Sequence, residues 1–69
     1  MRESTRVKRE LQAAGIRVIR IRVDCPGILQ VTMPKEQVHL LPRRAIRIQD
    51  TYAMFGPPPP GRVWAFIPY

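Results

Sequence analysis

Apolar side chains and arginines alternate in the segment 19–23, and a similar alternation recurs in the segments 45–49 and 62–67. A period of two places successive side chains on opposite faces of an extended chain, so each segment predicts a β-strand. Isoleucine and valine occupy one face, and arginine or a bulky aromatic residue occupies the other. The chain must therefore form a sheet whose apolar face is covered by another element.

Residues 4–14 predict the helix that covers this face. Glutamate, lysine, arginine, leucine, glutamine and alanine predominate in the segment, and proline is absent from it. Ser4 or Thr5 is expected to cap the start of the helix, and Gly15 suits the left-handed position that ends it. The residues of its apolar face are Val7, Leu11 and Ala14.

A hairpin is expected after the first strand. In the sequence Asp24–Gly27, proline and glycine suit the second and third positions of a type II turn. The return strand spans residues 28–33, with Leu29, Val31 and Met33 on its apolar face. Pro34–Pro42 predicts a single helical turn, which leads into the strand 45–49.

Residues 56–61 form a connector rich in glycine and proline. The run Pro57–Pro60 favours a stiff, extended polyproline conformation, which cannot donate hydrogen bonds to a sheet. One interpretation makes this run a spacer before the last strand, and the other makes it a ligand for an SH3 or WW groove. We favour the spacer, because the run lies between two apolar segments rather than in an accessible tail.

These elements predict an α+β fold in a single small domain, residues 1–69. Its N-terminal helix packs on a three- to four-stranded antiparallel sheet. The side chains expected beneath the helix are Ile19, Ile21, Leu29, Val31, Ile46 and Ile48.

The charge of the chain indicates an anionic partner. Ten arginines and two lysines oppose five carboxylates, which gives a net charge of +7. The planar guanidinium group matches phosphate and carboxylate geometry, so an excess of arginine favours polyanion recognition. The alternative is that a GC-rich genome has inflated the arginine content.

The candidate binding residues lie on the expected open face of the sheet, on the helix and in the Arg43–Arg44 pair. They are Arg6, Arg9, Arg20, Arg22, Arg43, Arg44, Arg47, Arg62 and Trp64. Gln30, Thr32 and Gln49 are expected beside the sheet arginines. Trp64 and Phe66 would stack unpaired bases if exposed, whereas core packing is their alternative fate. The alternative for the helix arginines is an ordinary solvated face.

These features predict a small nucleic-acid-binding protein, for DNA or RNA, with little sequence specificity. The main alternative is a basic adaptor or inhibitor, of the kind encoded by phages and mobile elements, that docks on an acidic protein surface. A third interpretation is a subunit that is basic because it is embedded in a larger assembly. No segment carries a recognised nucleic-acid-binding, phosphate-binding or other family signature.

Other functional classes are disfavoured. One histidine and one cysteine, His39 and Cys25, leave no catalytic constellation and at most two ligands of a metal site, so we expect neither an enzyme nor a cofactor. A disulfide framework needs a second cysteine. No apolar run approaches the roughly 18 residues of a membrane span, so a cytoplasmic protein without a membrane partner is expected.

A homodimer is also expected. A chain of 69 residues has a small core, and Trp64, Phe66 and Tyr69 near its end exceed what one helix can cover. The alternative is a monomer whose last strand folds back onto the sheet and buries Trp64.

Overall fold

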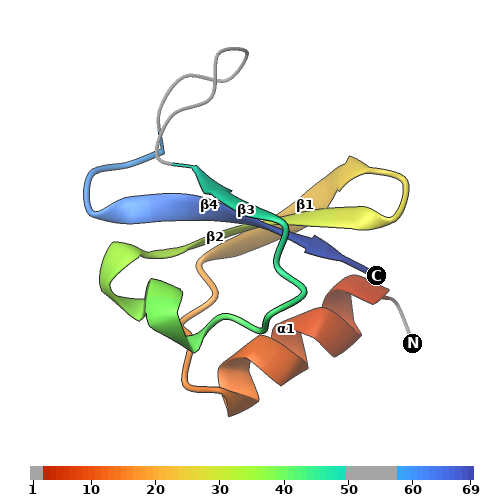
Figure 1. Ribbon diagram of the computed structural model, residues 1–69, viewed down its shortest axis with the longest axis horizontal. Helices are drawn as coiled ribbons and strands as arrows, with labels where there is room; N and C mark the ends of the chain where they lie inside the picture. Colours follow the sequence, from red (N-terminus) through yellow and green to blue (C-terminus); the bar gives the residue numbers. More distant parts are fainter. Residues whose placement is uncertain (1–2, 50–57) are drawn as a thin grey trace.

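The computed structural model describes residues 3–49 and 58–69, with the backbone alone described at 47–49. Its elements are α1 (Glu3–Ala13), β1 (Arg20–Cys25), β2 (Ile28–Pro34), the 3-10 helix η1 (Lys35–Leu40), β3 (Arg47–Gln49) and β4 (Arg62–Pro68). The strands form one antiparallel sheet in the order β1-β2-β4-β3. Figure 1 shows α1 lying across one side of this sheet. The predicted α+β fold is confirmed.

Helix α1 ends in a Schellman motif, as Gly15 predicts. The backbone N–H of Ile16 donates to the carbonyl of Leu11, and that of Gly15 donates to Gln12, each at 3.0 Å. Gly15 has a φ of 94°, which a side chain would disfavour. Leu11 and Ile16 are both buried in the core, so the motif also directs the chain from the helix to the sheet.

The start of α1 differs from the expectation. Because the helix already includes Glu3, the residues Ser4 and Thr5 lie within its first turn and are not its N-cap. Val7 and Leu11 are the buried residues of the helix, and both belong to the predicted apolar face.

The β1–β2 hairpin has the expected turn. Cys25 pairs with Ile28, so Pro26 and Gly27 form a two-residue loop, and Gly27 has the positive φ of 87° that the third turn position requires. The register places Arg20 opposite Thr32 in the pairing of the two strands. A bulge between residues 23 and 25 interrupts the pairing just before the turn.

The last strand, β4, lies between β2 and β3. This is the arrangement of the alternative in which the chain folds back onto its own sheet. One face of the two central strands packs against α1. The buried core on that side comprises Val7, Leu11, Ile16, Leu29, Val31, Met33, Val63, Ala65 and Ile67.

The opposite face of these central strands is also largely buried. Trp64 is 7% exposed and Phe66 is 1% exposed, while Gln30 and Thr32 are the buried polar residues of the described chain. Of the two alternatives for these aromatic rings, core packing is therefore confirmed, and neither ring is open for base stacking. Strand β4 has β2 on one side and β3 on the other, so its bulky residues lie away from the edges of the sheet.

Three of the six side chains expected beneath the helix have the predicted environment. Leu29 and Val31 are fully buried, and Ile21 is half-buried against the core. Ile46 is 56% exposed, because it precedes the three-residue strand β3 at the sheet edge. Ile19 is half-buried and lies outside the helix-side core, and the side chain of Ile48 is outside the described residues.

The described part of the proline run forms a turn rather than an extended connector. The N–H of Arg62 donates to the carbonyl of Pro59 at 3.1 Å, and Gly61 has a φ of 78°. The carbonyl of Gly61 accepts a hydrogen bond from the N–H of Lys35 at 2.9 Å, which attaches the turn to the start of η1. Residues 56 and 57 of the expected connector lie outside the described residues.

The segment 35–40 forms the predicted short helix, in the 3-10 conformation. Within residues 3–49 and 58–69, no helix combines the length and apolar character needed to cross a bilayer.

Two isoleucines provide a matched test of this architecture. Ile67→Val should lower the free energy of unfolding by about 0.5–1.5 kcal/mol, because Ile67 is fully buried. Ile46→Val should change it by less than about 0.5 kcal/mol, because that side chain is largely exposed. Urea denaturation followed by tryptophan fluorescence measures both. Equal losses in the two variants would contradict the observed burial.

Candidate functional site

The sheet face turned away from α1 contains a hollow of about 370 Å³. It extends over β1, β2 and β4 and reaches the turn before β4. Its lining residues are Ile19, Arg20, Arg22, Gln30, Thr32, Pro59, Arg62 and Trp64. The volume lies within the range of about 300–1,000 Å³ that is usual for ligand pockets.

The strand register explains how these residues come together. Arg20, Thr32 and Trp64 lie in one row across the three strands, because β2 pairs with both β1 and β4. Arg22 and Gln30 form the next row. Side chains two residues apart on a strand share a face, so the alternation in the sequence places these groups on the side opposite the core.

The hollow is strongly cationic. Arg20, Arg22 and Arg62 line it, and none of its described lining residues carries a carboxylate. Guanidinium groups can only donate hydrogen bonds and keep their positive charge at any physiological pH. The site therefore favours a ligand that carries negative charge and hydrogen-bond acceptors.

Gln30 lies at the base of this cluster and is 3% exposed. Its Oε1 accepts a hydrogen bond of 2.7 Å from Nε of Arg22. Its Nε2 is shielded from solvent and has no hydrogen-bond partner among the described residues. A buried donor without a partner costs about 1–3 kcal/mol, and such groups are rare in folded proteins.

The structure brings four of the nine predicted site residues together. Arg20, Arg22 and Arg62 converge on the hollow, and Trp64 lines it as a buried residue rather than an open stacking platform. Arg9 and Arg43 are exposed and lie outside the hollow, and the side chain of Arg47 is not described.

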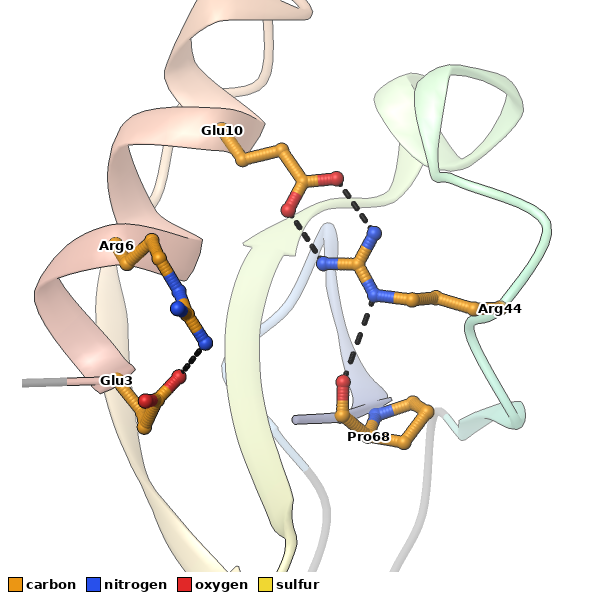
Figure 2. Close-up of polar contacts among 5 residues, drawn as sticks. All are labelled: Glu3, Arg6, Glu10, Arg44 and Pro68. Carbon is orange, nitrogen blue, oxygen red and sulfur yellow. Dashed lines mark hydrogen bonds and ion pairs between the residues drawn. The ribbon is translucent and has the colours of Figure 1, made fainter.

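The other two predicted residues form ion pairs (Figure 2). Arg6 pairs with Glu3 one turn away on α1. Arg44 donates both terminal nitrogens to the carboxylate of Glu10, and its Nε lies 3.5 Å from the carbonyl oxygen of Pro68. Arg44 thus connects α1 to the end of β4, and these two arginines have structural partners.

Glu10 and Arg44 affect each other's protonation. The hydrogen bonds from Arg44 hold the pKa of Glu10 below its ordinary value of 4.5, and its charge acts in the same direction while desolvation opposes it. The hydrogen bonds to Glu10 raise the pKa of Arg44. Both side chains are roughly half exposed, so the pair stabilises the fold only modestly.

The sequence analysis did not include Ile19 or Pro59 in the site, and it placed Gln30 and Thr32 on the face of the sheet arginines without naming them as binding residues. The signal that placed Gln30 and Thr32 there was the alternation of two polar residues with three apolar residues along β2. Pro59 had no such signal, because its position depends on the turn that precedes β4.

Within the described residues, no three side chains of the types that bind metals gather at one place. Cys25 is an exposed free thiol beside the β1–β2 turn.

The aromatic residues also bear on the expected homodimer. That expectation depended on uncovered Trp64 and Phe66, and both are buried within a single chain. The exposed large hydrophobic residues of the described chain are instead Val23, Ile46 and Tyr69. The homodimer remains a prediction, and of the three aromatic residues on which it was based only Tyr69 is exposed.

Comparison of the chain with protein-family models gives no match, and comparisons with curated proteins and with solved structures give none either. The case for a function therefore depends on the side chains of the hollow.

The Glu10–Arg44 pair predicts a defined pH dependence of stability. Because the pKa of Glu10 is lowered in the folded state, the stabilisation is complete above the ordinary pKa of 4.5 and is lost as the pH falls through the folded value. Arg44→Gln should cost about 0.5 kcal/mol at neutral pH, with little cost in strong acid. Urea denaturation across this pH range measures the difference.

Arg43→Gln is the matched control, since Arg43 is the exposed neighbour outside these hydrogen bonds. An equal, pH-independent loss of unfolding free energy in both variants would contradict the stabilising role of the Glu10–Arg44 pair. A double-mutant cycle with Glu10→Gln isolates their interaction.

Proposed function

We propose that this protein binds nucleic acid with little sequence specificity, through the sheet face that contains the arginine-lined hollow. The observation that carries the proposal is the convergence of Arg20, Arg22 and Arg62 on one concave site without a described carboxylate. The net charge of +7 supports it, because a positive field increases the rate of encounter with a polyanion.

The proposed interface lies on the sheet and excludes most of the helix. Arg6 and Arg44 are paired with carboxylates, and α1 covers the opposite side of the sheet (Figure 1). A single basic surface that combines the helix and sheet arginines is thus not supported. The arginines that converge on the proposed interface are Arg20, Arg22 and Arg62.

Low specificity follows from the kind of contact that arginines make with phosphate. Contacts to the phosphate backbone position a protein on nucleic acid but carry no sequence information. Reading a duplex usually requires a helix or a two-stranded ribbon that enters the major groove. Helix α1 covers the side of the sheet opposite the hollow, so it is not part of the proposed interface (Figure 1).

The proposal predicts salt-sensitive binding that depends on the arginines of the hollow. Labelled oligonucleotides of unrelated sequence should bind with similar affinity at low salt, as measured by fluorescence anisotropy. Arg20→Gln and Arg62→Gln should each reduce the slope of log affinity against log salt by about 0.7 on single strands. Each phosphate contact that is lost accounts for one such decrease.

Arg9→Gln is the matched control, because it removes the same charge from an exposed position outside the hollow. Its slope should remain close to that of the unmodified protein. An equal decrease of the salt slope in all three variants would show that binding depends only on net charge. Failure to bind any oligonucleotide at low salt would overturn the proposal and favour an acidic protein as the partner.

A further inference from the structure

The Nε2 donor of Gln30, which has no partner among the described residues, gives more information about the ligand than the arginines do. Arg22 can only donate hydrogen bonds, so the amide must present Oε1 to it. That contact directs the other end of the amide, the Nε2 donor, to a buried position without a partner among the described residues. A ligand in the hollow that supplies an acceptor would satisfy this donor.

The rest of the hollow restricts the class of this ligand. Arg20 and Arg62 are suited to phosphate, while Pro59 and the small exposed part of Trp64 supply apolar surface. A volume of about 370 Å³ is that of a small-molecule site rather than a groove for a helix. The ligand therefore combines a phosphate, a group with apolar surface and a hydrogen-bond acceptor, and a nucleotide combines all three.

In a duplex the bases are stacked and paired, so their edges do not enter a pocket of this size. An unpaired nucleotide can place its base inside the hollow while its phosphate remains at the rim. We propose that the hollow binds one unpaired nucleotide, with Arg20 and Arg62 on the phosphate and Gln30 Nε2 donating to an acceptor of the base. This inference rests on the proposed function and adds a preference for single strands.

The principal test compares a single-stranded oligonucleotide with a duplex of the same sequence by fluorescence anisotropy at one low salt concentration. The unmodified protein should bind the single strand at least about 10-fold more tightly. Gln30→Met, which keeps a similar side-chain length but lacks the amide, should lose most of this preference. Its affinity for the duplex should stay within about 2-fold, because phosphate contacts remain.

Gln12→Met is the matched control, since Gln12 is exposed on α1. It should leave both affinities unchanged. Urea denaturation of Gln30→Met distinguishes a ligand-binding amide from a structural one. An amide kept for binding predicts that this variant is at least as stable as the unmodified protein, whereas a structural amide predicts a less stable variant.

A second measurement uses the protein without substitutions. The chain has one tryptophan, Trp64, which lines the hollow, so its fluorescence should respond to a bound nucleotide. A nucleoside 5′-monophosphate should change the emission at concentrations at least about 10-fold lower than inorganic phosphate does. An equal response to the two probes would indicate a simple phosphate site and overturn the base contact.

The outcomes separate this inference from the proposed function. Equal affinity for single strand and duplex, or a preference that survives in Gln30→Met, would overturn the nucleotide pocket and leave nucleic-acid binding intact. Absence of binding to both oligonucleotides would overturn the proposed function, and the inference would fall with it.

Discussion

The pairing of β2 with β4 is the constraint on which the rest of the structure depends. These central strands are paired along seven residues each, and the interior five residues of both are buried. One set of alternating side chains contacts α1, while the other forms the base of the hollow. A single strand pair therefore supplies both the hydrophobic core and the floor of the candidate site.

The sequence predicted the individual helices and strands more accurately than it predicted which strands lie side by side. Period-two alternation, the Pro26–Gly27 turn and Gly15 are local signals, and the structure confirms each of them. The position of β4 between β2 and β3 is a long-range property that no local pattern specifies. For this reason the sequence analysis left two alternatives for Trp64, an open face or the core, and the structure shows that its strand is central and its side chain is buried.

The same limit explains the result for the isoleucines. Ile46 has an apolar, alternating context that resembles that of a core strand, but it lies beside the short edge strand β3 and is mostly exposed. The arginines show the corresponding limit for charge. The sequence shows how many positive residues the chain has. Only the folded structure shows that Arg44 contacts a carboxylate and that Arg20 and Arg62 line the same cavity.

Both faces of β4 are buried, and this limits which changes in the sequence the protein can tolerate. A slip of one residue in the pairing of β4 would exchange the two faces of the strand, because side chains alternate with a period of two. Trp64 and Phe66 would then face the helix, and Val63, Ala65 and Ile67 would move to the hollow. Any change that misplaces the site in this way also destroys the core, so selection for a folded chain preserves the geometry of the hollow.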